Sequence, residues 1–194
     1  MAKPEETDDL DFTSHFETKA VLAESLPAAE KLVLDPEFRI GTSKLEADGF
    51  FVAVARRSHA AADPPTGFRV MFVEDEPVTH AVLKKVLTTD GFEAHGAFDA
   101  AGLGKLLKAQ GLPNLILLDV ELPKVSGLQI LSRIRKHPKI RSIPVLIVTS
   151  RAELSDVVRG LSLGANGYLT KPVTVESLRA VLRQILGRLP GKPA

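Results

Sequence analysis

Five polar side chains stand where short apolar runs of the chain end. Glu74 and Asp75 follow one run and Asp119 a second, while Thr149 and Lys171 come at the ends of two more. If these runs are parallel strands, their carboxyl ends meet at one edge of a sheet, so the other four groups would surround Asp119. Crowded carboxylates repel one another unless a cation joins them, and Mg²⁺ prefers oxygen ligands of this kind.

This set of groups suits phosphoryl transfer to a carboxylate. An aspartate can act as the nucleophile that forms an aspartyl phosphate. Lys171 and a metal ion would then neutralise charge on the phosphoryl oxygens, and Thr149 would offer a hydroxyl hydrogen bond. Taken singly, each residue is also common as an ordinary turn or cap residue, so the argument depends on their convergence.

The stretch that carries Asp119 is Leu115–Leu118. Four apolar residues in a row, entered after Leu112-Pro113-Asn114, indicate a strand buried on both faces. Asp119 then opens a loop shaped by Pro123 and Gly127. Such a strand is typical of a parallel α/β sheet, whose strand ends bind ligands.

Strand-like and helix-like patterns alternate from Phe68 onward. Pro77 is a favoured first-turn residue of a helix, and Thr174 can cap the last helix. The pattern predicts five strands, at 69–73, 92–97, 115–118, 143–148 and 167–170, and five helices, at 77–89, 100–109, 127–136, 153–163 and 174–189. We therefore expect a doubly wound α/β domain with a five-stranded parallel sheet.

The remainder of the chain divides into three pieces. Residues 1–57 are expected to form a small α+β extension, a helix and a strand pair behind a disordered tail, and 58–67 form a Pro-rich linker. The domain itself is predicted at 68–189, with a tail at 190–194. Residues 1–67 hold 7 basic and 13 acidic residues, net −6, whereas 68–194 hold 18 and 11, net +7. Opposite charge and the phenylalanines of the extension suggest that it docks on the domain or on a second copy.

Composition narrows the function classes. The chain of 194 residues has no cysteine, which excludes disulfides and thiolate metal sites. No apolar run approaches the ~20 residues of a membrane span, and the acidic start is unlike a signal peptide, so a cytoplasmic protein is expected. The formal net charge of +1 argues against direct nucleic-acid binding.

From Phe68 to the last helix, the sequence resembles the receiver domains of two-component response regulators. Glu74-Asp75 resembles the acidic pair of that family, Asp119 its phosphoacceptor, Thr149 its switch hydroxyl and Lys171-Pro172 its Lys-Pro pair. Intervals of 44, 30 and 22 residues separate Asp75, Asp119, Thr149 and Lys171, as the family favours. The loop from Asp119 to Gly127 follows its D-x-x-x-P-x-x-x-G pattern.

The resemblance implies a flavodoxin-like strand order of 2-1-3-4-5 and a Mg²⁺ site. Its ligands would be Glu74, Asp75, Asp119 and the backbone carbonyl of Glu121. Glu74 stands where the family more often has Asp, and Leu122 where it usually has Met.

The resemblance also implies a conformational switch. Tyr168, in the segment Gly164–Tyr168, would be the aromatic switch residue that turns in from solvent when Thr149 moves. Glu121 and Arg151 would tune the lifetime of the phosphoryl group, and Lys171-Pro172 is the candidate for a cis peptide bond.

The implied function is that of a response regulator, not a metabolic enzyme. A sensor histidine kinase or a phosphotransfer protein would phosphorylate Asp119 and change the contacts of the face made by the fourth helix, fifth strand and last helix. That face, or the N-terminal extension, could support a homodimer. Arginines 159, 179 and 183 mark the face as a partner site or simply as a solvated helix surface.

Two other functions fit parts of the sequence. Asp119-Val120-Glu121 is similar to the D-x-D motif of haloacid-dehalogenase-like phosphatases, although that class places it after the first strand. A phosphorylation-independent interaction module with a receiver fold is the other alternative. Residues 37–57 resemble the terminal strand pair of Rossmann-type methyltransferases, without a cofactor loop or a catalytic cysteine.

Overall fold

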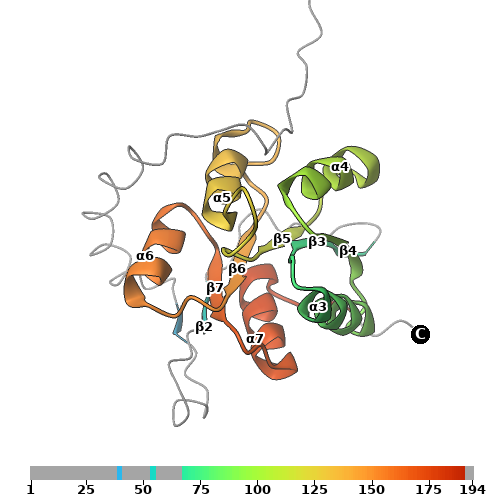
Figure 1. The fold of residues 1–194 in the computed structure, drawn as a ribbon. Coiled ribbons are helices and arrows are strands. Elements are labelled where there is room, and N and C mark those ends of the chain that lie inside the picture. Colours follow the sequence, from blue (N-terminus) through green and yellow to red (C-terminus); the bar gives the residue numbers. More distant parts are fainter. Residues whose placement is uncertain (1–38, 41–52, 56–66, 191–194) are drawn as a thin grey trace, which may run out of the picture.

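The structure, a computed structural model, describes residues 39–40, 53–55 and 67–190. Its centre is one seven-stranded sheet in the order β1-β2-β7-β6-β5-β3-β4, with helices on both faces (Figure 1). The strands are β1 (Arg39–Ile40), β2 (Ala53–Ala55), β3 (Arg69–Val73), β4 (Glu93–Ala97), β5 (Leu115–Leu118), β6 (Val145–Thr149) and β7 (Gly167–Thr170). The helices are α3 (Pro77–Thr89), α4 (Ala100–Gln110), α5 (Gly127–Lys136), α6 (Leu154–Ser162) and α7 (Val175–Leu186).

Five of these strands form the parallel sheet expected from the sequence. Counted along the domain, β3, β4, β5, β6 and β7 are strands 1 to 5, and their order in the sheet is 2-1-3-4-5. The predicted fold class is therefore confirmed. Strand β5 lies at the centre, and all four of its residues are buried, as a strand covered on both faces requires.

Each face of the sheet has its own apolar layer. One layer packs α4, α5 and α6 against the sheet and includes Leu103, Ile130 and Val157. The other packs α3 and α7 against the opposite face and includes Leu83 and Leu182. The two layers fix the strand ends relative to one another, which is what positions the polar groups at the sheet's edge.

Local sequence explains where the helices begin. Ser126 and Thr174 each form a capping box. The side chain of the cap residue accepts a hydrogen bond from the N–H at the N3 position, and the N3 side chain accepts one from the N–H of the cap residue. Glu76 caps α3 by accepting from the N–H groups of Val78 and Thr79, directly before Pro77. Pro77 and Thr174 thus have the positions predicted for them.

Element ends differ slightly from those expected. Strand β6 begins at Val145 and not at residue 143, and Thr149 is its last residue. Pro144 has no N–H for the ladder, although its carbonyl accepts from Ile116. Helix α7 ends at Leu186, three residues before the predicted boundary, with Gly187 in the left-handed conformation (φ 78°) as its cap.

Two pieces of the N-terminal extension join the sheet. Strand β2 pairs antiparallel with β7, and β1 pairs antiparallel with β2. The predicted tail and helix, the linker up to residue 66 and residues 191–194 lie outside the described residues, so these domain assignments stay predictions. No helix in the described ranges is long and apolar enough to cross a membrane.

Candidate functional site

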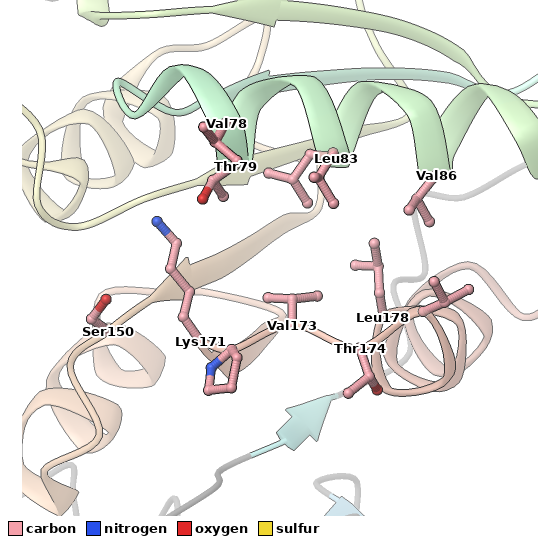
Figure 2. A pocket seen from close by; sticks show the side chains of 12 residues that line it. Val78, Thr79, Leu83, Val86, Ser150, Lys171, Val173, Thr174 and Leu178 are labelled. Atoms are coloured by element: carbon pink, nitrogen blue, oxygen red, sulfur yellow. The ribbon is translucent and has the colours of Figure 1, made fainter.

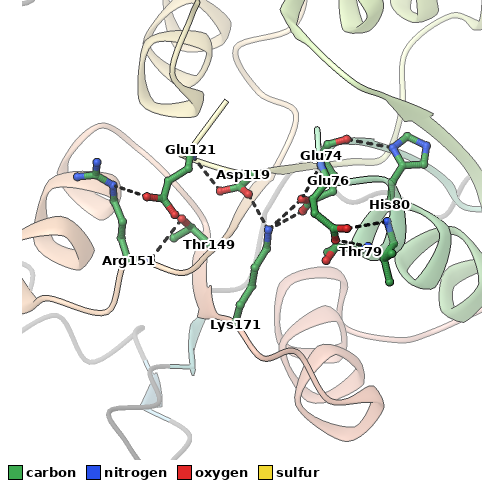
Figure 3. A network of polar contacts seen from close by, with 10 residues as sticks. Glu74, Glu76, Thr79, His80, Asp119, Glu121, Thr149, Arg151 and Lys171 are labelled. Atoms are coloured by element: carbon green, nitrogen blue, oxygen red, sulfur yellow. Dashed lines mark hydrogen bonds and ion pairs between the residues drawn. The ribbon is translucent and has the colours of Figure 1, made fainter. Parts of the chain in front are cut away.

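Asp119 follows the central strand and lies almost completely buried, with 4% of its surface exposed. Its N–H donates to the carbonyl of Val73 on β3 (3.0 Å). Its Oδ1 accepts from the N–H of Glu121 (2.9 Å), and its Oδ2 lies 2.6 Å from Nζ of Lys171. The carboxylate is thus held at the carboxyl edge of the sheet by groups from three segments of the chain (Figure 3).

Lys171 joins Asp119 to Glu74. Its Nζ lies 2.8 Å from Oε2 and 3.0 Å from Oε1 of Glu74, the residue that follows β3. The N–H of Lys171 donates to the carbonyl of Thr149 (2.8 Å), and the Lys171–Pro172 peptide bond is cis. One ammonium group therefore faces two buried carboxylates at the ends of two different strands.

The charges in this cluster are only partly balanced. Burial raises the pKa of Glu74 above its ordinary value, against the lowering effect of Lys171. Burial also lowers the pKa of Lys171, but its hydrogen bonds to Asp119 and Glu74 outweigh this, so the pKa of Lys171 lies above its ordinary value. Among the described residues, Oε2 of Glu74 is a buried atom without a well-formed hydrogen bond. Its charged partner is Nζ of Lys171, 2.8 Å away, and Asp119 shares that ammonium. One ammonium thus serves two buried carboxylates.

Asp75 completes an acidic cluster. One carboxylate oxygen from each of Glu74, Asp75 and Asp119 can be placed within 4.8 Å of the others, and Asp75 is exposed. Lys171 pairs with two of these three carboxylates, so the four groups together carry a formal charge of −2 when all are ionised. Oxygen donors with this excess of negative charge fit a divalent cation such as Mg²⁺. The donor atoms of the cluster are therefore of the kind that a Mg²⁺ site requires.

Thr149 and Arg151 form the opposite side of the site. Thr149 is fully buried, and its Oγ1 accepts from the N–H of Arg151 at a long 3.4 Å. The Arg151 side chain is half exposed and lies 3.7 Å from Glu121 and 3.7 Å from Asp156. The structure thus brings the predicted polar side chains of the site to one edge of the sheet.

Tyr168 differs from the expectation of a ring that waits in solvent. Its side chain is fully buried, and its hydroxyl donates to the carbonyl of Arg151 (2.9 Å). Burial strongly raises the pKa of its hydroxyl. A glycine on α6 explains the difference, because a Cβ at Gly160 would stand 3.1 Å from Cδ2 and Cε2 of the Tyr168 ring. The missing side chain leaves space for the inward ring.

Gly127 has a similar role in the Asp119 loop. A Cβ at this position would stand 1.9 Å from the carbonyl oxygen of Asp119, and the N–H of Gly127 donates to the carbonyl of Val120 (3.1 Å). The loop can fold back on itself only because α5 begins with a residue that has no side chain.

Sequence reasoning missed the support behind Glu74. The ring of His80 lies between Phe72 and Phe98, with ring centroids 4.7 and 4.0 Å away, and its Nδ1 lies 3.1 Å from the carbonyl oxygen of Glu74. The position of His80 on α3, one turn after the acidic run, was the available signal. Gly160 was also missed, because no pattern distinguishes it from other helix glycines.

Of the three arginines expected on one face, Arg159, Arg179 and Arg183, Arg179 has its partner elsewhere in the domain. Arg179 forms a two-pronged ion pair with Asp90, which follows α3, and its Nε lies 2.8 Å from Oδ2 of that carboxylate. This pair joins α7 to the end of α3, away from β7. Arg179 is therefore engaged within the domain, and its part in a partner site on the face of α6, β7 and α7 stays a prediction. The sequence could not show that a carboxylate 89 positions away would reach it.

Comparison with known proteins decides the family. A family model described as the response regulator receiver domain matches residues 70–183, more than half of the chain. The chain belongs to the response regulator receiver domain family. The receiver domain includes the acidic cluster, Asp119, Thr149 and Lys171, and β1 and β2 lie outside it.

Curated relatives and solved structures agree. The regulator RpaA of Synechocystis, a DNA-binding dual master transcriptional regulator, is 35% identical over 62% of this chain and 49% of its own length. TrcR of Mycobacterium tuberculosis is 38% identical over 68% and 49%. The chain spans about half the length of the curated relatives it matches. The solved structure of a CheY-like receiver domain protein of Methanospirillum hungatei matches with a TM-score of 0.57 and 27% identity, over 63% of this chain and 95% of that structure. CheY4 of Vibrio cholerae matches with a TM-score of 0.58 and 26% identity, over 62% of this chain and 100% of that structure.

Family membership has direct consequences. The receiver domain is a signalling domain of two-component systems and not a metabolic enzyme, as expected from the sequence. Receiver domains interact with histidine kinases or phosphotransfer proteins, and they bind Mg²⁺ at an acidic cluster of the kind described above. The haloacid-dehalogenase-like alternative has no support, because Asp119 follows the third parallel strand of a receiver domain.

Proposed function

We propose that this chain accepts a phosphoryl group on Asp119 from a sensor histidine kinase or a phosphotransfer protein, and then changes its contacts with other proteins. The observation that carries this proposal is the buried Asp119 carboxylate with Lys171 Nζ at 2.6 Å from Oδ2. The ammonium is positioned to hold the carboxylate before transfer and to meet added negative charge after it.

The transfer itself needs little from the protein beyond positioning. An oxygen of the Asp119 carboxylate forms the new O–P bond as the P–N bond of the donor's phosphohistidine breaks, and the imidazole leaves with the electron pair and takes up a proton. The N–H of Glu121, 2.9 Å from Oδ1, fixes the orientation of the nucleophile. The product carries roughly two negative charges, and Lys171 and Thr149 are the groups available to it.

We propose Mg²⁺ as the cation of the acidic cluster. Glu74, Asp75 and Asp119 would hold it, with the backbone carbonyl of Glu121 as the further ligand that the family implies. The bound ion would lower the charge on the phosphoryl oxygens. Support comes from three carboxylate oxygens that lie within 4.8 Å of one another, and from the raised pKa of the buried Glu74.

Glu121 and Arg151 would set the lifetime of the phosphoryl group. Their side chains are about half exposed and lie 3.7 Å apart, and the N–H of Glu121 donates to Asp119 (Figure 3). Because water must pass such groups to reach the phosphorus, separating the pair should change the rate of phosphoryl loss. Comparing that rate in Arg151→Ala and the wild type tests this role.

The phosphodonor would dock on the groove beside Lys171. This groove has a volume of about 480 Å³ and lies between α3 and the segment from β7 to α7 (Figure 2). Val78 and Val82 line it on the α3 side and are 69% and 51% exposed. Exposed aliphatic side chains beside the acceptor site suit an apolar helix face of a donor protein.

The experiment is incubation of the full chain with acetyl phosphate, with Mg²⁺ or with a chelator, followed by intact-mass measurement. Uptake of one phosphoryl group only with Mg²⁺ supports the proposal. No uptake with any donor would favour the phosphorylation-independent interaction module. Steady release of phosphate from a small phosphoester would instead indicate a phosphatase.

We further propose that the chain is cytoplasmic, that it can form a homodimer through the face of α6, β7 and α7 or through the N-terminal extension, and that it does not bind nucleic acid directly. RpaA is described as DNA-binding, but the chain spans about half its length. Electrophoretic mobility of duplex DNA with and without the chain would test the last of these predictions.

A further inference from the structure

The edge of the receiver sheet at β7 is covered by the chain itself. Strand β2 pairs with β7 through Ala53 with Leu169, Val54 with Tyr168 and Ala55 with Gly167, and β1 adds a second strand outside β2. The family match begins only at residue 70. An uncovered edge strand offers unpaired N–H and C=O groups to any other strand. Here residues 39–40 and 53–55, the N-terminal ribbon, occupy that position.

One small side chain packs this ribbon against the domain. Ala55 is 3% exposed and belongs to the apolar layer of α3 and α7. The same layer contains Leu169 from β7 and Leu182 from α7, and β2 contacts α7 as well as β7. A charged or larger group at residue 55 would not fit in this layer without displacing a neighbour. The ribbon is therefore held by a backbone ladder and by apolar packing.

The middle residue of the ladder on β7 is Tyr168, which the sequence predicts to be the aromatic switch. Tyr168 pairs with Val54 through its backbone, while its hydroxyl donates to the carbonyl of Arg151. The N–H of Arg151 donates to Oγ1 of Thr149, and Thr149 pairs with Thr170 at the end of β7. Tyr168 is thus linked to the acceptor site by its side chain and to the ribbon by its backbone.

We propose that the N-terminal ribbon is an intramolecular ligand of the β7 edge whose docking is linked to the state of Asp119. This proposal rests on the proposed function. Phosphorylation would draw Thr149 and Lys171 toward the new group, and Lys171 directly follows β7. The structure shows the ribbon docked with Asp119 unmodified, and a ladder of three residue pairs is short, so a change in β7 releases it.

Linkage gives this proposal a second consequence. If a phosphoryl group weakens docking of the ribbon, the docked ribbon weakens binding of a phosphoryl group by the same factor. Loss of docking should therefore raise the affinity of the site for a phosphoryl mimic, whereas a ribbon without linkage would leave the affinity unchanged.

The first test is hydrogen exchange on the full chain, with Mg²⁺ alone and with Mg²⁺ plus beryllofluoride as the phosphoryl mimic. We expect amides of residues 53–55 to be protected with Mg²⁺ alone and to exchange about tenfold faster with beryllofluoride, a typical coupling between two sites. Fast exchange of 53–55 in both conditions would overturn docking. Unchanged protection with the mimic bound would overturn the linkage.

The second test compares two variants in which an alanine is replaced by aspartate. Ala55→Asp disrupts the apolar packing of the ribbon, and Ala109→Asp makes the same change at an exposed alanine of α4. Beryllofluoride titrations can be followed by the fluorescence of Tyr168, because the chain has one tyrosine and no tryptophan. Ala55→Asp should bind the mimic about tenfold more tightly than the wild type, and Ala109→Asp should match the wild type. Equal affinities would overturn the linkage.

Other outcomes separate this proposal from the proposed function. If beryllofluoride does not bind to the wild type at all, the proposed function fails, while protection of residues 53–55 still decides whether the ribbon docks. Sedimentation provides the remaining control. A dimer of the wild type that dissociates in Ala55→Asp would mean that the ribbon pairs with a second copy, and the intramolecular arrangement would be overturned.

Discussion

Nζ of Lys171 lies 2.6 Å from Oδ2 of Asp119, although the two residues follow different strands and are 52 positions apart. The same ammonium lies 2.8 Å from Oε2 of Glu74. Lys171 thus holds the acceptor and the acidic cluster together before any phosphoryl group arrives. It also connects the acceptor to β7, so a charge added to Asp119 would act on the residue that directly follows this strand.

Asp119→Asn should abolish phosphoryl uptake from acetyl phosphate, because an amide is a poor nucleophile. Intact-mass measurement checks the loss. Asp99→Asn is the matched control, since it makes the same change at the exposed N-cap of α4, where Asn is equally suitable. Uptake at the wild-type level in Asp119→Asn would refute the assignment of the acceptor.

Asp75→Ala should weaken Mg²⁺ binding by about tenfold or more, or about 1.4 kcal/mol, because an exposed carboxylate of the cluster is lost. Glu74→Asp should have a milder effect, since it only shortens a carboxylate arm. Glu76→Gln is the control, because that carboxylate caps α3. Calorimetric Mg²⁺ titration measures all three variants. Equal and negligible effects at Glu74 and Asp75 would place the metal elsewhere.

Lys171→Ala should retain some phosphorylation but lose its coupling to β7, and Thr149→Ala should do the same less severely. Without Mg²⁺ the Lys171 variant should lose about 2 kcal/mol or more of unfolding free energy, because Glu74 and Asp119 stay buried without their partner. Denaturant unfolding measures the loss, and Mg²⁺ should restore part of it. Amide shifts of 154–167 on phosphorylation report the coupling. Wild-type shifts in Lys171→Ala would contradict this role.

Gly160→Ala should push the Tyr168 ring out of its buried position. Ala in place of Gly normally stabilises a helix interior by about 1 kcal/mol. Here the new Cβ would stand 2.6 Å from Cδ1 of Ile147 and 3.1 Å from the Tyr168 ring, so we expect a loss of stability instead. Acrylamide quenching of the single tyrosine should increase. A more stable variant with a protected tyrosine would show that the space at Gly160 does not control the ring.

The sequence by itself determined the receiver fold and the members of the site. The apolar run Leu115–Leu118 ends in Asp119, and similar runs precede Glu74 and Lys171. A strand buried on both faces needs such a run, and parallel strands bring their carboxyl ends together. Burial and strand direction are encoded locally, so the convergence of these groups could be inferred without coordinates.

Only the tertiary structure decided how the side chains pair and which strands cover the edge. Lys171 contacts both Glu74 and Asp119, Arg179 contacts Asp90, and Tyr168 lies inside against Gly160. These choices depend on distances between segments far apart in the chain. The pairing of β2 with β7 uses backbone hydrogen bonds, for which every residue has a carbonyl acceptor and every residue except proline an N–H donor. Sequence patterns therefore predict well which residues are buried. Which side chains and strands contact one another is decided only when the layers pack together.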